Sequence, residues 1–169
     1  MNSITLKSRA KINLSIDVLG KRQDGYHLVE MIMQTIDLYD LIEINEKDND
    51  QITIKSTSDE IPLDCNNLVY KAANLIKKTF NINKGVEIHI KKNIPVAAGS
   101  SNAAAVLVGL NKLWNLNLSN QQLEKIGLKL GADVPFCING GAVLALGIGE
   151  ELTPIKGLTK DVCILVCKP

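Results

Sequence analysis

Hydrophobic and polar residues alternate with a period of two over residues 9–20. The apolar positions are Ala10, Ile12, Leu14, Ile16 and Val18, and the polar positions between them are Lys11, Asn13, Ser15 and Asp17. This alternation predicts a β-strand with one face against a core. The polar face is either solvated or forms the wall of a cleft, and the pattern leaves both interpretations open.

Turn signals and further alternation predict the other strands. The Asp-Gly pair within residues 20–25 favours a tight hairpin turn after the first strand. Residues 41–44 and 51–55 flank a polar loop, and we predict that they pair as a second hairpin. The remaining predicted strands are residues 86–91, 142–146, 151–155 and 162–166.

Three helices are predicted between these strands. The first is capped by Asn66 or Asn67 and ends near Phe80. The second opens at about Asn102, and the third runs from a cap at Ser119 to Gly131. The order of strands, helix, strand, two helices and strands indicates an α+β fold, with one antiparallel-rich sheet and helices on one face.

Length, charge and cysteine usage limit the classes of protein to which this chain can belong. The 169 residues are enough for one domain with a core, and a net charge of +1 provides no general attraction to nucleic acid or membranes. No apolar run approaches the ~20 residues of a membrane span, and no signal-peptide pattern opens the chain. We therefore expect a cytoplasmic protein without nucleic-acid or membrane partners. The cysteines lack metal-ligand spacing, and we expect reduced, mostly buried thiols at Cys65, Cys137, Cys163 and Cys167.

The segment that joins the strand at 86–91 to the second helix is the strongest candidate for chemistry. It consists of Pro95, Val96, Ala97, Ala98, Gly99, Ser100, Ser101 and Asn102. Free N–H groups and the positive end of the helix dipole together form an anion site at a helix start. Neither a Walker A sequence nor a G-x-G-x-x-G sequence occurs there, and an ordinary capped helix is the simpler interpretation.

Other polar residues complete a set of groups suited to phosphoryl transfer, which requires an anion cradle, a cation and a base. Lys11 lies on the polar face of the first strand. Asp133 lies on a turn among apolar neighbours, because Pro135 disfavours helix at the residue before it. Such an acid is commonly a solvated loop residue. Tyr26 and His27 follow the hairpin turn, where they are either surface residues or groups that stack on a base and bond its edge.

Five segments, in order along the whole chain, resemble the GHMP kinase superfamily. Within it they resemble the branch that phosphorylates a cytidine diphosphate-linked methylerythritol. The Gly-Ser-Ser sequence is common to the superfamily, whereas Asp-Gly-Tyr-His and Gly-Ala-Asp-Val-Pro-Phe are more specific to that branch. The five segments are residues 10–14, 20–27, 33–38, 94–104 and 130–136.

The resemblance implies a fold and an activity. The fold is the two-layer GHMP kinase N-terminal domain, with a mixed, antiparallel-rich sheet similar to domain 2 of ribosomal protein S5, over residues 1–169. The activity is transfer of the γ-phosphate of ATP, with Mg²⁺, to the 2-hydroxyl of the cytidyl substrate in the methylerythritol-phosphate route to isoprenoids.

The resemblance also implies a role for each candidate residue. Asp133 is expected to be the catalytic base, and Lys11 to keep it ionised and to stabilise the phosphoryl group. Asn13 is expected to place the methylerythritol part, Tyr26 to stack on the cytosine, and His27 to hydrogen-bond it. The segment from Pro95 to Asn102 is expected to lie along the ATP phosphates, with Ser100 near Mg²⁺.

The chain departs from the family in two ways. The family's glycine loop has several more residues between the positions of Gly99 and Ser100, and the family continues beyond Pro169 into a C-terminal domain that this chain lacks. Two alternatives therefore remain beside the kinase. One is an isolated domain that binds the cytidyl ligand without turnover. The other is an RNA-binding protein with the same fold, which the near-neutral charge disfavours. The sequence does not specify an oligomeric state.

Overall fold

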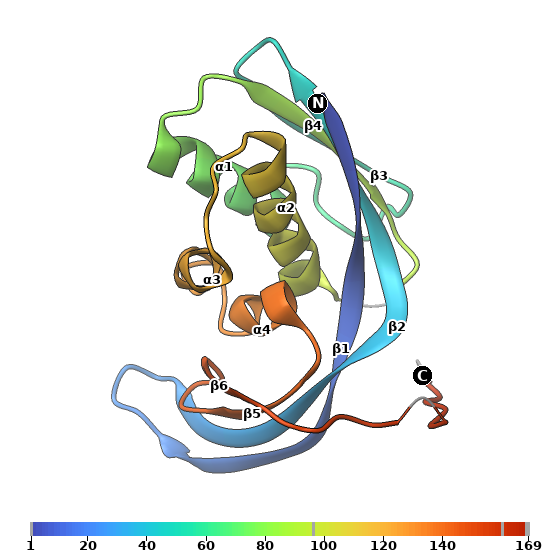
Figure 1. The fold of residues 1–169 in the computed structure, drawn as a ribbon, viewed down its shortest axis with the longest axis vertical. Helices are drawn as coiled ribbons and strands as arrows, with labels where there is room; N and C mark the ends of the chain where they lie inside the picture. Colours follow the sequence, from blue (N-terminus) through green and yellow to red (C-terminus); the bar gives the residue numbers. More distant parts are fainter. Residues whose placement is uncertain (1, 96, 160, 168–169) are drawn as a thin grey trace.

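The computed structural model describes residues 2–95, 97–159 and 161–167. Four helices lie on one face of a six-stranded mixed sheet in these residues (Figure 1). The predicted two-layer α+β fold is confirmed. Val96, which belongs to the predicted phosphate segment, lies outside the described residues.

A long antiparallel hairpin forms the backbone of the sheet. Strands β1 (Ser3–Lys21) and β2 (His27–Lys47) pair from Ser3 opposite Asn45 to Lys21 opposite His27. The predicted turn joins them, and Gly25 adopts the left-handed backbone (φ 91°) that this turn requires. The first predicted hairpin is therefore confirmed.

Strand β2 pairs with β1 along one edge and with two other strands along the opposite edge. Its C-terminal half pairs with β4 (Gly85–Lys91) and its N-terminal half with β5 (Ala142–Leu146), both antiparallel. Strand β3 (Ile52–Ser56) lies parallel to β4, and β6 (Glu151–Pro154) pairs with β5.

The second predicted hairpin is therefore wrong. Residues 41–44 belong to β2, and β4 separates that strand from β3. The side chains of Val86, Ile88 and Ile90 on β4 are fully buried. Such an apolar strand gains most from an interior position with neighbours on both edges, which moves β3 to the outside.

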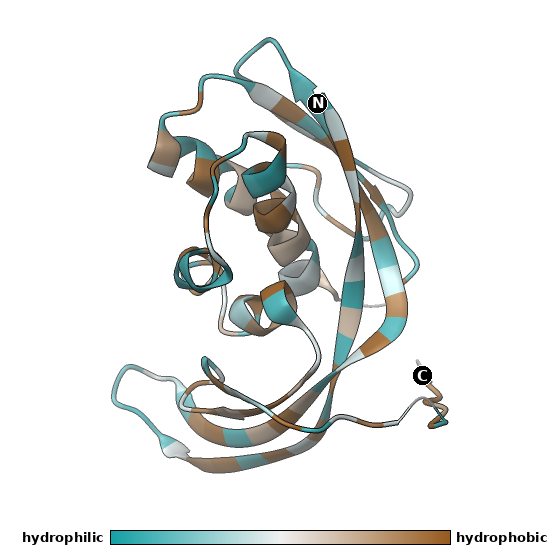
Figure 2. Cartoon of the chain, in the orientation of Figure 1, coloured by the Kyte–Doolittle hydropathy of each residue, from teal (hydrophilic) through white to brown (hydrophobic). Residues whose placement is uncertain are grey.

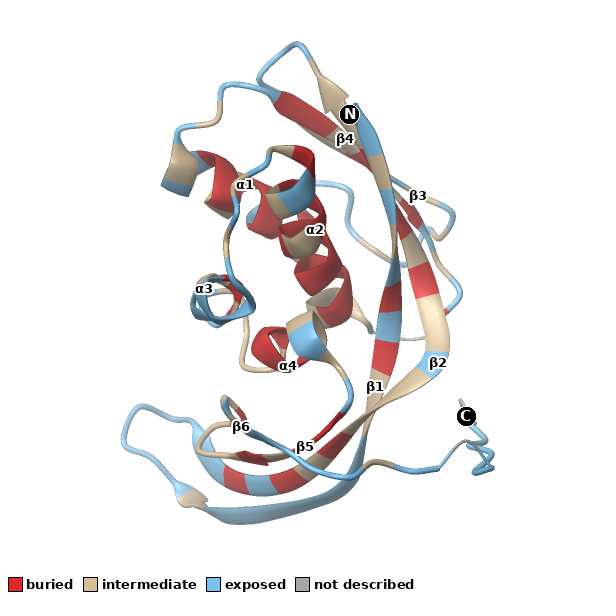
Figure 3. Cartoon of the chain, viewed as in Figure 1, coloured by how far each residue is buried: buried red, intermediate tan, exposed pale blue. Residues whose placement is uncertain are grey.

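Helix α2 (Gly99–Leu113) lies at the centre of the helical layer. It packs on β1, β2, α1 (Leu68–Phe80) and α4 (Val134–Asn139), and most of its residues are buried (Figure 3). Gly109 permits this close packing, because a Cβ there would lie 2.6 Å from Ile44 Cδ1. Helix α3 (Asn120–Gly127) packs beside α4.

The helix caps are predicted only in part. The side chain of Asn67 accepts a hydrogen bond from Val69 N at the start of α1, as predicted, and Ser119 forms a capping box at the start of α3. Helix α2 begins at Gly99, three residues before the predicted start. Helix α3 ends at Gly127, well before Gly131.

Helix α4, which follows Asp133 directly, was not predicted. Pro135 occupies its first turn. Proline is tolerated there because a first-turn N–H has no acceptor within the helix. Val134 is therefore helical, although Pro135 was expected to disfavour helix at that residue.

The predicted apolar face of β1 is buried only at its beginning. Ala10 is buried, whereas Leu14, Ile16 and Val18 are exposed. Three irregularities in the pairing, the first between Arg9 and Lys11, shift the alternation. The far part of the hairpin also extends past the helical layer (Figures 1 and 2).

The segment 162–166 is exposed and forms no strand, contrary to prediction. A strand requires a neighbour to satisfy its backbone groups, and no pairing reaches this segment within the described chain. The expectation of mostly buried thiols is also wrong, because Cys65, Cys163 and Cys167 are exposed and only Cys137 is partly buried. None of the described helices has the length and apolar character needed to cross a bilayer.

Candidate functional site

Lys11 and Asp133 meet across a groove between the sheet and the helical layer. Lys11 Nζ lies 3.1 Å from Asp133 Oδ2, and the two side chains are 21% and 37% exposed. Lys11 Nζ also donates a hydrogen bond to Asn13 Oδ1 at 3.0 Å. The structure thus brings together three of the predicted site residues.

Local structure explains why the Asp133 carboxylate faces Lys11. Asp133 occupies the N-cap position of α4, but its backbone is helical (φ −80°, ψ −15°) and its side chain makes no capping hydrogen bond. The backbone carbonyl of Asp133 accepts from Cys137 N at 3.2 Å. The carboxylate is therefore available to the ammonium group and to the adjacent cavity.

A cavity of about 300 Å³ joins this ion pair to the predicted phosphate segment. Its walls include Lys11 and Asp133 together with Pro95 and the residues from Ala97 to Ser101. The first N–H groups of a helix have no acceptor within it. The first helical bond of α2 at this end is from Asn102 N to Ala98 O, at 2.9 Å. The positive end of the α2 dipole therefore faces the same space as Lys11.

The loop that enters α2 is conformationally strained. Ala97 and Ala98 have φ angles of 54° and 64°, in the left-handed region. Such a conformation costs about 1–3 kcal/mol for a residue other than glycine and persists only where the surroundings enforce it. No side chain caps α2 among the described residues. The loop thus leaves the helix start open to a ligand.

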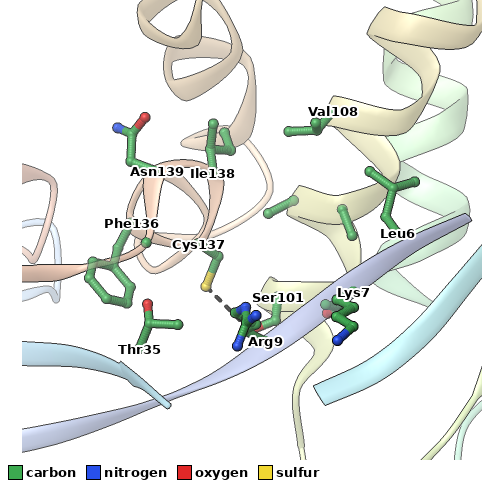
Figure 4. Close-up of a pocket in the computed structure, with 14 residues that line it drawn as sticks. Leu6, Lys7, Arg9, Thr35, Ser101, Val108, Phe136, Cys137, Ile138 and Asn139 are labelled. Carbon is green, nitrogen blue, oxygen red and sulfur yellow. Dashed lines mark hydrogen bonds between the residues drawn. The ribbon is translucent and has the colours of Figure 1, made fainter. Parts of the chain in front are cut away.

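The connection between α3 and α4 lies against the first turn of α2. A Cβ placed on Gly131 would lie 3.9 Å from Ser100 Oγ, and Ser101 Oγ is 3.4 Å from Cys137 Sγ. Ser101 and Cys137 line both this cavity and a second one, of about 200 Å³, whose lining residues come from β1, α2, α4 and nearby segments (Figure 4). Burial raises the pKa of the Cys137 thiol, so this side chain is a neutral part of the wall.

Asn102 does not face the cavity. Its side chain is buried, its Nδ2 donates to Asp40 Oδ2 at 3.0 Å, and its Oδ1 accepts from Ser8 Oγ at 2.6 Å. Its N–H is bonded to Ala98 O. The buried side chain of Asn102 therefore supports the loop, and a contact of this residue with the phosphates stays a prediction.

Tyr26 and His27 are not brought to the ion pair. They lie at the turn end of the hairpin, where Lys21 is opposite His27, whereas Lys11 is opposite Thr35. Ten strand residues span about 30 Å at ~3.3 Å each, and the bend of the hairpin reduces that separation (Figure 1). Tyr26 is 55% exposed. Their role toward a cytosine stays a prediction.

The sequence analysis missed Asp40, a fully buried acid on β2. Its position among Leu38, Tyr39 and Leu41 was the available signal, because an acid within an apolar strand requires partners. A dedicated metal centre is not evident. Among the described residues, no group of three or more His, Cys, Asp or Glu side chains could hold an ion.

Sequence and structure comparisons define the class of this protein. Residues 67–141 match the family described as GHMP kinases N terminal domain. The fold also matches a crystal structure of 4-(cytidine 5'-diphospho)-2C-methyl-D-erythritol kinase, with a TM-score of 0.75 and 31% identity over 90% of this chain and 55% of the other. Over the matched residues the chain is therefore similar to the N-terminal domain of GHMP kinases.

Several relatives that match the whole chain are named 4-diphosphocytidyl-2-C-methyl-D-erythritol kinase. The protein of Clostridioides difficile (strain 630) is 70% identical over 100% of this chain and 58% of its own length. That of Alkaliphilus metalliredigens (strain QYMF) is 58% identical over 100% of this chain and 59% of its own length. The chain thus spans little more than half the length of these relatives.

Both alignments contain positions that this chain lacks. Each runs over 173 positions, whereas the chain has 169 residues. The relatives are therefore slightly longer within the matched region.

Proposed function

We propose that this chain is the N-terminal domain of a kinase that transfers the γ-phosphate of ATP to the 2-hydroxyl of 4-diphosphocytidyl-2-C-methyl-D-erythritol. This reaction belongs to the methylerythritol-phosphate route to isoprenoids. The observation that carries the proposal is the contact of Lys11 with Asp133, 3.1 Å apart, in one cavity with the start of α2. The name shared by the relatives supports the choice of substrate.

The geometry suits an in-line displacement at phosphorus. The hydroxyl oxygen of the substrate attacks the γ-phosphorus, the bond from that phosphorus to the bridging oxygen of ADP breaks, and the hydroxyl proton passes to Asp133. Lys11 orients this carboxylate and stabilises negative charge on the transferred group. N–H groups at the start of α2 hold the phosphates, as helix N-termini do.

Mg²⁺ fits the donors in the cavity. This ion commonly keeps several waters and takes only one or two protein oxygens beside the phosphates of the nucleotide. The Ser100 hydroxyl and the Asp133 carboxylate, both in the cavity wall, are the oxygens available to it. When bound, Mg²⁺ neutralises charge on the phosphates.

Asn13 and the hairpin turn provide the groups proposed for the substrate. Asn13 Oδ1 accepts a hydrogen bond from Lys11 Nζ, so Asn13 lies beside the reacting groups. The exposed ring of Tyr26 offers a face on which a cytosine can stack, and His27 offers ring nitrogens for hydrogen bonds.

The test is ATP-dependent phosphorylation of the cytidyl substrate. We would compare this 169-residue chain with a version extended to the length of its relatives. The kinase proposal requires turnover by the extended chain, lost on Asp133→Asn while ATP is still bound. Absence of turnover in both chains, with the cytidyl compound still bound, would instead support a ligand-binding module.

A further inference from the structure

Asp40 has an unusual environment for an acid. Its side chain is fully buried on β2, next to Leu41, which lies opposite Lys91 at the end of β4. Oδ1 accepts from Asn93 N and Ile94 N, each at 2.8 Å. Oδ2 accepts from Lys92 Nζ at 2.8 Å and from Asn102 Nδ2 at 3.0 Å. The carboxylate therefore has four donors on its two oxygens.

These donors come from both sides of the phosphate segment. Asn93 and Ile94 immediately precede Pro95, and Asn102 lies in α2 just after Ser101. One carboxylate thus holds the two ends of the loop that lines the cavity beside Lys11. Ser8 on β1 extends the connection, because its hydroxyl donates to Asn102 Oδ1 at 2.6 Å.

The energetic cost of this arrangement indicates that it is more than a surface contact. Burial of a charge is expensive unless partners satisfy it, and hydrogen bonds to a charged group contribute more than neutral ones. The side chain of its partner Lys92 is itself only 10% exposed. Removal of one member of such a buried pair leaves the other without compensation. Asp40 is therefore a strong constraint on the loop.

We propose that Asp40 is a positioning residue for the nucleotide, which fixes both ends of the segment from Pro95 to Ser101 and so sets where the first N–H groups of α2 point. This inference rests on the proposed function, because it assigns the segment to ATP phosphates. It also accounts for the left-handed Ala97 and Ala98, since fixed ends can enforce a conformation that alanine otherwise avoids.

The decisive variant is Asp40→Asn. The amide oxygen of the variant can still accept from the loop, but its NH₂ group faces the donors of Lys92 and Asn102. We expect affinity for Mg-ATP, measured by calorimetry on the extended protein, to fall about tenfold or more, as for loss of bonds to a charged group. Affinity for cytidine diphosphate should stay within about twofold, because the hairpin turn is untouched.

Hydrogen exchange provides a readout that does not depend on ATP. Amides in the peptides that cover residues 92–102 should exchange faster in Asp40→Asn, while those of α3 keep their wild-type rates. Asn102→Ala supplies a second variant if Asp40→Asn does not fold. It removes only the α2 side of the connection, and it should show the same pattern with a smaller change.

Lys77→Met is the matched control. Lys77 is also a buried lysine paired with an aspartate, since its Nζ donates to the carboxylate and the carbonyl of Asp50, but it lies in the last turn of α1. A merely structural effect would lower stability in both variants alike. We expect Lys77→Met to lower stability without changing either ATP affinity or exchange in residues 92–102.

The outcomes separate this inference from the proposed function. Wild-type ATP affinity in a folded Asp40→Asn protein would overturn the inference, as would unchanged exchange in residues 92–102. Absence of ATP binding by the wild-type extended protein would overturn the proposed function. In that case faster exchange in the variant would still support Asp40 as the residue that fixes the loop.

Discussion

Lys11 on β1 and Asp133 at the start of α4 form an ion pair, with Lys11 Nζ 3.1 Å from Asp133 Oδ2. The two residues are far apart in the sequence. The contact depends on the packing of α2 against β1 and of α4 against α2. It places a cation and a carboxylate beside the start of α2, and the chemistry proposed for the site requires all three.

Asp133→Asn should abolish most of the turnover of the extended protein. An amide cannot accept the hydroxyl proton, so we expect the turnover number to fall by about 10²–10⁴, the usual contribution of a general base. Folding should be normal, because Asp133 is partly exposed. Steady-state kinetics and circular dichroism provide the measurements. The control is Asp37→Asn, which removes an exposed carboxylate paired with Arg9 outside the cavity. Equal turnover in the two variants would remove Asp133 from the mechanism.

Tyr26→Ala should mainly weaken binding of the cytidyl substrate. Loss of one stacking ring removes about 1–3 kcal/mol, which corresponds to a rise in the Michaelis constant of about 5- to 150-fold. The free energy of unfolding should change little, because the ring is 55% exposed. Tyr26→Phe retains the ring and should behave as the wild type. An unchanged Michaelis constant for Tyr26→Ala would contradict the stacking role.

Asp40 should make stability sensitive to acid. Burial by itself would raise the pKa of this carboxyl, but hydrogen bonds from Ile94, Lys92, Asn93 and Asn102 together hold it below the ordinary value of 3.8. Because the pKa is lower in the folded state than in the unfolded state, the ionised carboxylate stabilises the fold. This stabilisation is fully present at pH values above the unfolded-state pKa. The stabilisation is lost as the pH falls through the pKa that Asp40 has in the folded protein.

The measurement for Asp40 is urea unfolding at a series of pH values from neutrality to below 3.8. We expect the free energy of unfolding of the wild type to fall over the acid part of the series. Asp40→Asn should show a shallower fall, because its amide does not titrate. If Asp40 did not contribute to the pH dependence, the free energy of unfolding would fall equally with pH in the wild type and in Asp40→Asn.

Ala98→Gly should stabilise the domain. Ala98 has a φ of 64°, and glycine adopts this region without the steric cost that alanine incurs. We expect a gain of about 1 kcal/mol in the free energy of unfolding, reduced by the greater chain entropy of glycine when unfolded. Ala104→Gly, inside α2, should instead destabilise the domain by about 1 kcal/mol or more. A loss of stability in Ala98→Gly would contradict the strain inferred for the loop.

Local signals predicted the elements whose residues act on their immediate neighbours. The Asp-Gly turn, a cap at Asn66 or Asn67 and a cap at Ser119 were predicted correctly, because each depends on a few adjacent backbone groups. Strand partners were less predictable. Strand β4 lies beside β2 because it buries more apolar area in the interior of the sheet than at an edge. The alternation within a strand does not indicate which strand will be its neighbour.

The candidate residues followed from the sequence, but their arrangement did not. Residue types and the family resemblance identified Lys11, Asp133 and the phosphate segment. Tertiary packing placed these three around one cavity, turned Asn102 inward toward Asp40, and left Tyr26 exposed at the far end of the hairpin. The physical reason is that turns and caps are set by short-range sterics and hydrogen bonds. The orientation of a polar side chain is set by distant residues that pack against it.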